Sequence, residues 1–292
     1  MNAIEVRDLT RVFAKTRAVD SVTLEVPGGS VFGLLGPNGA GKSTLLNLLV
    51  GHLRATSGSV TVLGQPVSSR DSAPWQRTGY ASQTRYLPGW MTAAECLRFA
   101  SAFHPQWDAA KVQRLVKRLE LPLPARVRDL SRGHYVRLQI VLALAHNPEL
   151  ILLDEPTSGL DPVGRRELLT LLIEEIEPSA GRTVIFSSHL VEDVERMADC
   201  VAILDDGRIV ASGPIDTLKG KRSRVEFSQA VAEADLSAIP GLIALKKGQV
   251  GNVVVTSEPD NAVRYLQSRG AADAAVASVS FEQVFFDYVN RS

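Results

Sequence analysis

The stretch Gly36-Pro37-Asn38-Gly39-Ala40-Gly41-Lys42-Ser43 fits the pattern G-x-x-x-x-G-K-[ST] in full. It follows the apolar run Ser30–Leu35, which is typical of a buried strand, and it leads into Lys42–His52, whose leucine spacing predicts a helix. In this strand–turn–helix setting the pattern indicates a phosphate-binding loop rather than an ordinary glycine turn. The glycines let the backbone wrap a chain of phosphates with its N–H groups exposed, and the helix presents the positive end of its dipole to the same anion.

The residues of this loop predict binding of ATP together with Mg²⁺. Lys42 can reach the β- and γ-phosphates, Ser43 can ligate Mg²⁺, and Thr44 can add a hydroxyl to an inner phosphate. The other loop residues expected to contact the nucleotide are Gly36, Pro37, Asn38, Gly39, Ala40 and Gly41.

A second candidate motif is Leu150-Ile151-Leu152-Leu153-Asp154-Glu155, an apolar run that ends in two acids. Asp154 is expected at the carboxyl end of a core strand, where it holds Mg²⁺ through water. Glu155 is then placed to polarise an attacking water as a general base. Alone, the run is also compatible with a helix cap. Paired with Gly36–Ser43 in one α/β domain, it becomes a strong indication of nucleotide hydrolysis.

The N-terminal part of the chain predicts a small antiparallel β subdomain. Apolar and polar residues alternate there as they do in half-buried strands. The alternating runs are Ile4–Leu9, Val22–Val26 and Val60–Leu63.

Residues 84–148 show helical spacing and predict a helical subdomain inserted into an α/β core. Its helical runs are Ala93–Phe103, Ala109–Leu119 and Tyr135–Ala145. After it, buried strands and helices alternate, which implies a parallel sheet with crossover helices. These runs are Leu150–Leu153, Arg165–Ile176 and Thr183–Ser187. We therefore predict an α/β fold of the P-loop NTPase type over residues 1–222.

Residues 223–292 predict a small α+β accessory domain without a titratable cluster that suggests chemistry. Its expected strands are Val225–Phe227, Ile243–Leu245, Val253–Val255 and Ala275–Val279, and Asp260–Ser268 is expected to be a helix. Ser280 and Gln283 form the pattern of a capping box at the start of a last amphipathic helix.

The composition of the chain limits the classes of partner and the cellular compartment that we expect. Lys plus Arg and Asp plus Glu both total 32, so the formal net charge is zero, which argues against a general nucleic-acid binder. The two cysteines, Cys96 and Cys200, have no metal or redox spacing and fit a reduced cytosolic setting. The charged start lacks the apolar region of a signal peptide, and no apolar run approaches the ~18 residues of a membrane span. If the protein works at a membrane, another polypeptide is expected to cross it.

The motifs above, with others in the same order, resemble the ATP-binding cassette family, the motor subunits of ABC transporters, over about residues 3–220. Phe13 falls at the family's adenine-stacking position. Gln83, in Tyr80-Ala81-Ser82-Gln83, matches the glutamine that contacts Mg²⁺ and the water. Asp161, in Ser158-Gly159-Leu160-Asp161, matches the D-loop, and His189 matches the switch histidine that contacts the γ-phosphate.

The signature of the family usually reads Leu-Ser-Gly-Gly-Gln, and here it reads Leu130-Ser131-Arg132-Gly133-His134. The resemblance implies that Ser131 and Gly133 face the γ-phosphate of a nucleotide held by another copy. For Arg132 three alternatives stand: an approach to the phosphates, an ion pair with an acid of the facing copy, and a side chain that points to solvent.

The resemblance implies an ATPase that drives transport through separate transmembrane permease subunits. One cassette per chain implies pairing with a second ATP-binding subunit, as a homodimer or a heterodimer, at the cytoplasmic face of the membrane. Segments such as Tyr86–Trp90, Phe103–Trp107 and Ser280–Phe285 also resemble subunits for export of drugs and antibiotics, so export is the expected direction, and the isolated chain is expected to be soluble. The alternatives are a soluble cassette ATPase of translation or DNA repair and a nucleotide-sensing regulatory subunit.

Overall fold

The computed structural model describes residues 1–67, 75–175, 181–220, 223–229, 231–247, 252–277 and 280–289. The chain packs as two compact units, Met1–Ser212 and Gly213–Ser292. The division falls within strand β10 (Arg208–Pro214), whereas the sequence places the domain boundary at residue 222.

The centre of the first unit is a six-stranded sheet in the order β10-β9-β3-β8-β7-β6. Neighbouring strands from β9 to β6 run parallel. The strands besides β10 are β9 (Cys200–Asp205), β3 (Val31–Leu35), β8 (Thr183–Ser188), β7 (Leu150–Leu153) and β6 (Thr78–Ala81). Every residue of β7 and β8 is buried, as expected for parallel strands covered on both faces. The predicted parallel sheet is confirmed.

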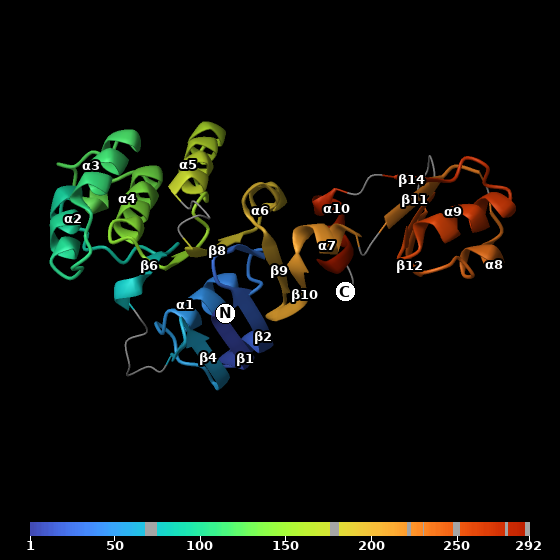
Figure 1. The fold of residues 1–292 in the computed structure, drawn as a ribbon, viewed down its shortest axis with the longest axis horizontal. Coiled ribbons are helices and arrows are strands. Elements are labelled where there is room, and N and C mark those ends of the chain that lie inside the picture. Colours follow the sequence, from blue (N-terminus) through green and yellow to red (C-terminus); the bar gives the residue numbers. More distant parts are fainter. Residues whose placement is uncertain are drawn as a thin grey trace. The chain divides into compact units, whose positions relative to one another are not determined.

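An antiparallel sheet, in the order β2-β1-β4-β5, forms the predicted N-terminal β subdomain. Its strands are β1 (Asn2–Phe13), β2 (Thr16–Pro27), β4 (Ser57–Val62) and β5 (Gln65–Pro66). Figure 1 shows β1, β2 and β4 beside α1 (Lys42–Leu49). The buried side chains of this sheet, of α1 and of the parallel sheet share one apolar core, which holds α1 against both sheets.

The helical subdomain consists of α2 (Ala93–Ser101), α3 (Ala109–Arg118) and α4 (Arg132–Leu144), drawn in green in Figure 1. Each begins at a side chain that accepts a backbone N–H three residues on: Thr92, Asp108 and Ser131. α4 also packs on β6. The helical subdomain thus contacts the edge of the parallel sheet at the strand that leads to Gln83.

Two further helices follow strands of the parallel sheet. α5 (Pro162–Glu175) follows β7, and α6 (Val191–Met197) follows β8 and packs on β3. A Cβ on Gly33 would lie 2.7 Å from a methyl of Val194, so glycine in β3 allows α6 to approach this closely.

The second unit contains a four-stranded antiparallel sheet in the order β12-β13-β11-β14. Its strands are β11 (Ser223–Phe227), β12 (Leu242–Lys247), β13 (Asn252–Thr256) and β14 (Ala275–Ala277), and its helices are α7 (Ile215–Gly220), α8 (Glu233–Leu236), α9 (Pro259–Ser268) and α10 (Phe281–Val289). α9 packs on β11 and β14. The Gln283 N–H donates to Ser280 Oγ at 3.2 Å and the Ser280 N–H donates to Gln283 Oε1 at 3.3 Å, which is the predicted capping box. Residues 278–279 of the predicted strand Ala275–Val279, and Ile176, lie outside the described residues.

Some predicted boundaries are wrong. α1 ends at Leu49 and not at His52, since Gly51 has a φ of 70°. α4 begins at Arg132 and not at Tyr135, because Ser131 caps it. Among the residues that the structure describes, no helix is long and apolar enough to cross a bilayer.

Candidate nucleotide-binding site

Four candidate segments meet because they leave the carboxyl ends of four neighbouring parallel strands. The loop Gly36–Ser43 follows β3, Ser187–His189 ends β8, Asp154–Glu155 follows β7, and Gln83 comes soon after β6. In open α/β sheets, ligands bind at this edge. The sheet order therefore places residues from four distant parts of the sequence around one site.

The phosphate loop has the conformation that its glycines allow. Gly39 and Gly41 have φ values of 86° and 101°, in the left-handed region. A Cβ on Gly41 would lie 2.2 Å from the Ala18 carbonyl oxygen, and one on Gly36 would lie 2.2 Å from that of Leu204. At Gly39, by contrast, a Cβ would meet no atom within 4 Å, so the backbone there faces open space. The loop fits a phosphate chain on that open side.

The ammonium group of Lys42 is buried within the loop. Its Nζ donates to the carbonyl oxygens of Gly36 at 2.7 Å and Pro37 at 3.0 Å. It also lies 3.1 Å from Glu155 Oε1, without hydrogen-bond geometry, and both side chains are only 5% exposed. Lys42 is therefore held at the phosphate loop as the counter-ion of Glu155.

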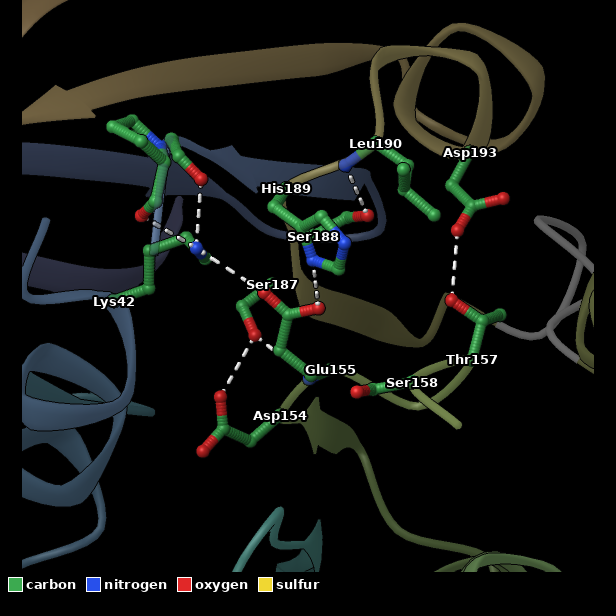
Figure 2. A network of polar contacts seen from close by, with 12 residues as sticks. Lys42, Asp154, Glu155, Thr157, Ser158, Ser187, Ser188, His189, Leu190 and Asp193 are labelled. Carbon is green, nitrogen blue, oxygen red and sulfur yellow. Dashed lines mark hydrogen bonds and ion pairs between the residues drawn. The ribbon is translucent and has the colours of Figure 1, made fainter. Parts of the chain in front are cut away.

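Ser43, Asp154 and Ser187 form a second set of contacts. Asp154 Oδ1 accepts hydrogen bonds from Ser43 Oγ at 2.9 Å and from Ser187 Oγ at 2.8 Å, the latter drawn in Figure 2. Burial raises the pKa of the Asp154 carboxyl above its usual value, and the bonds from Ser187 and Ser43 oppose that rise. A hydroxyl and a carboxylate side by side are oxygen donors of the kind that Mg²⁺ prefers. This pair fits the predicted magnesium site. No group of three or more His, Cys, Asp or Glu in the described ranges could hold a metal ion. Gln83, the third predicted Mg²⁺ ligand, lines the same cavity as Ser43.

Glu155 is fixed at both carboxylate oxygens (Figure 2). Oε2 lies 2.8 Å from His189 Nδ1, and Oε1 faces Lys42. The Glu155 N–H donates to Ser187 Oγ at 2.8 Å. Its φ of 49° is uncommon for a residue with a side chain, and such strain is concentrated at functional sites. The structure thus brings together Lys42, Glu155 and His189, three of the four residues predicted to act on the γ-phosphate and the water.

A cavity of about 530 Å³ opens at this edge of the sheet. Its lining contains nine of the predicted site residues, two residues that the sequence does not single out, and Arg132, for which an approach to the phosphates is one of the three alternatives. The predicted ones are Asn38, Gly39, Gly41, Lys42, Ser43, Thr44, Gln83, Glu155 and His189, and the others are Ala18, Arg132 and Ser158. The volume is in the range of small-molecule sites.

Known proteins are similar to this chain. A family model described as ABC transporter matches residues 19–158. The Nod factor export ATP-binding protein I of Cupriavidus metallidurans is 36% identical over 217 residues, which are 72% of this chain and 70% of that protein. The chain belongs to the ABC transporter family.

Other ABC proteins are similar to this chain in sequence or in fold. An uncharacterized ABC transporter ATP-binding protein of Nostoc sp. is 38% identical over 72% of this chain. The solved ATP-binding subunit of an ABC transporter has a TM-score of 0.66 at 28% identity, over 74% of this chain and 92% of that one. A dimeric bacterial ABC transporter cassette has a TM-score of 0.65 at 25% identity, over 72% and 98%. The chain spans 63%, 65% and 62% of the length of the first three curated relatives, just under two thirds.

Several residues expected at the ABC nucleotide lie outside the cavity lining. Phe13 is 40% exposed at the end of β1, with the Arg11 guanidinium 4.4 Å from its ring centroid. Asp161 Oδ1 accepts the backbone N–H groups of Val163 and Gly164, so this carboxylate caps α5. Neither Phe13 nor Asp161 lines the cavity that contains Lys42 and Glu155, and their contact with nucleotide stays a prediction.

The signature residues Ser131 and Gly133 lie at the start of α4. Ser131 Oγ accepts the His134 N–H at 3.1 Å, so its hydroxyl is the N-cap of the helix. Neither Ser131 nor Gly133 lines the cavity of its own chain. Their contact with the nucleotide of another copy stays a prediction.

Sequence reasoning missed Ser187 as a site residue. It bonds to both the Asp154 carboxylate and the Glu155 N–H. The available signal was its position as a buried polar residue at the carboxyl end of a core strand, two residues before the switch histidine.

Proposed function

We propose that this chain is the ATP-hydrolysing subunit of an ABC transporter and that it powers export through separate membrane subunits. The observation that carries the proposal is the position of Glu155, held between Lys42 and His189 at the edge of the phosphate loop. An acid fixed in this way beside a phosphate-binding loop is suited to activate water. The similarity to Nod factor export proteins supports export as the direction.

The contacts around Glu155 suggest how this chain would act on ATP. On nucleotide binding, Lys42 would exchange its contact with Glu155 for the β- and γ-phosphates, since both compete for the same ammonium. Glu155 would then keep the bond to His189 and accept the proton of the attacking water. That water would bond to the γ-phosphorus as the bond to ADP breaks. Mg²⁺ at Ser43 and Asp154, with Gln83 nearby, would supply charge neutralisation of the phosphates.

Two partners follow from this proposal. A second ATP-binding subunit, identical or different, would supply the signature that completes each site, and transmembrane permease subunits would receive the motion. The chain would then work at the cytoplasmic face of the membrane.

Purification of the tagged chain from a detergent extract at native expression tests the proposal. We expect it to co-purify with a protein of several membrane spans, and we expect the complex to hydrolyse Mg-ATP. Removal of Mg²⁺ with EDTA should stop hydrolysis. Recovery with ribosomes or DNA, and without any membrane protein, would favour the soluble cassette ATPase instead.

The signature gives a prediction for the assembled complex. Ser131→Ala should lower turnover about 10- to 100-fold, since a hydrogen bond to a charged group is worth about 1.5–3 kcal/mol. It also removes an N-cap worth about 0.5–2 kcal/mol, so the variant should melt at a lower temperature. Ser131→Asp separates the two effects because it keeps a cap and repels phosphate. We expect near-normal melting and an equal or larger loss of turnover. Full activity of Ser131→Asp would contradict a phosphate contact at this position.

A further inference from the structure

The side chain of Arg132, at a signature position where the ABC family usually has glycine, lies across the D-loop of its own chain. Its Nη2 donates to Ser158 Oγ at 2.8 Å. A Cβ on Gly159 would lie 2.4 Å from Arg132 Cδ and 2.5 Å from Nε. The arginine stem therefore occupies the space that a side chain at position 159 would need. Of the three alternatives that the sequence leaves open for Arg132, none includes this contact.

A second contact joins the same two segments. A Cβ on Gly133 would lie 3.1 Å from Leu160 Cδ2, so the signature backbone itself packs against the D-loop. The Ser158 N–H in turn donates to the Glu155 carbonyl oxygen at 3.0 Å. A continuous series of contacts thus runs from the signature through Arg132 and Ser158 to the residue proposed as general base.

The other side of the signature is tied to the segment that follows Gln83. Arg85 Nη2 donates to the Leu130 carbonyl oxygen at 3.3 Å, and its guanidinium lies 4.9 Å from the Tyr135 ring centroid. The Tyr135 hydroxyl accepts the N–H groups of Tyr86 at 2.8 Å and Leu87 at 3.2 Å. The start of α4 is thereby held from both sides, and Arg132 supplies the side-chain hydrogen bond toward the D-loop.

We propose that Arg132 is a positioning residue that joins the signature to the D-loop within one chain, so that the two segments move together. In the proposed dimer the signature faces the partner's nucleotide, while the D-loop continues from Glu155. Arg132 would thus couple occupancy of the partner's site to the position of this chain's own base. This consequence for turnover rests on the proposed ATPase function, whereas the link between the two segments does not.

Gly159 has a φ of 76°, where a side chain is strained, and its missing Cβ leaves room for the guanidinium stem. The position of the Arg132 side chain therefore requires glycine at position 159. A side chain at 159 would displace Arg132 even where the backbone adapted.

Hydrogen–deuterium exchange of the full-length, nucleotide-free protein tests the link directly. We expect Arg132→Ala to speed amide exchange in residues 157–161 about three- to tenfold, since loss of the contact frees the loop for local opening. Ser158→Ala should have the same effect, and the double variant should add little to either single one. The matched control is Arg128→Ala, an arginine of the same segment whose side chain is 61% exposed. It should leave exchange in 157–161 unchanged.

Turnover supplies a second measurement. In a hydrolysing complex, Arg132→Ala should lower kcat about two- to fivefold, with a smaller change in the Kd for ATP because Arg132 also lines the cavity. Adding Ser158→Ala to the Arg132→Ala variant should not lower kcat further. Unchanged exchange in residues 157–161 of Arg132→Ala, or fully additive effects, would overturn the inference. Faster exchange in Arg132→Ala, together with a wild-type complex that hydrolyses no ATP, would sustain the link and overturn the proposed function alone.

Discussion

Replacement of Glu155 by glutamine is expected to lower ATP turnover about 10²–10⁴-fold, the usual scale for loss of a general base. Glutamine has nearly the same shape, so it can keep a contact with His189, which lies 2.8 Å from Glu155 Oε2. It cannot accept the proton of the attacking water. ATP binding should be retained, because Lys42 and the loop backbone are unchanged. Phosphate release under excess Mg-ATP and equilibrium binding of ATP measure the two effects separately.

The same variant should accumulate as a dimer. Nucleotide that is bound and not hydrolysed remains between the two copies, so size-exclusion chromatography with Mg-ATP should show a species of twice the mass. Glu149→Gln is the matched control, since Glu149 precedes the same strand and pairs at 2.5 Å with Arg77 away from the cavity. It should hydrolyse ATP normally. Unchanged kcat in Glu155→Gln would remove Glu155 from the role of base.

The sequence predicts the centre of the site well because the motifs that form it are short, continuous segments of the chain. The apolar strand Leu150–Leu153 has the same bounds in the structure as in the prediction. The conformation of the loop Gly36–Ser43 depends on glycines that the sequence shows directly. Once the sheet is parallel, its carboxyl edge must gather the residues that follow each strand. The meeting of Lys42, Asp154, Glu155 and His189 is a consequence of that rule.

Other features depend on contacts between distant segments and carry no local signal. The sequence patterns do not predict β6, β9 and β10. β6 has only four residues and includes a glycine, and a short apolar run such as β9 cannot be told from a buried helix segment by periodicity alone. The bond between Arg132 and Ser158 joins residues 26 apart in the sequence. Nothing in the motif Leu130–His134 shows which way the arginine turns. The ion pair of Lys42 with Glu155 is likewise a property of the folded chain, and it changes what a substitution of Lys42 should do.

Lys42→Ala should weaken ATP binding about 10- to 100-fold, because charge-assisted hydrogen bonds to the phosphates are lost. It should also destabilise the protein itself. The carboxylate of Glu155 would remain 5% exposed without its cation, and an unpaired buried charge costs about 3–5 kcal/mol. Thermal unfolding without nucleotide should therefore show a clear loss of stability. A binding defect alone would not reveal whether the fold or the phosphate contact had been damaged.

The double variant Lys42→Ala/Glu155→Gln separates these two causes. It removes both charges, so its stability should exceed that of Lys42→Ala and return toward the wild type. Its affinity for ATP should stay as low as that of Lys42→Ala, because glutamine at 155 supplies no cation to the phosphates. Glu155→Gln alone, which keeps Lys42, should bind ATP at least as tightly as the wild type, since the ammonium no longer has a competing carboxylate. If the double variant regains ATP affinity along with stability, Lys42 acts through the fold of the loop and not through contact with the phosphates.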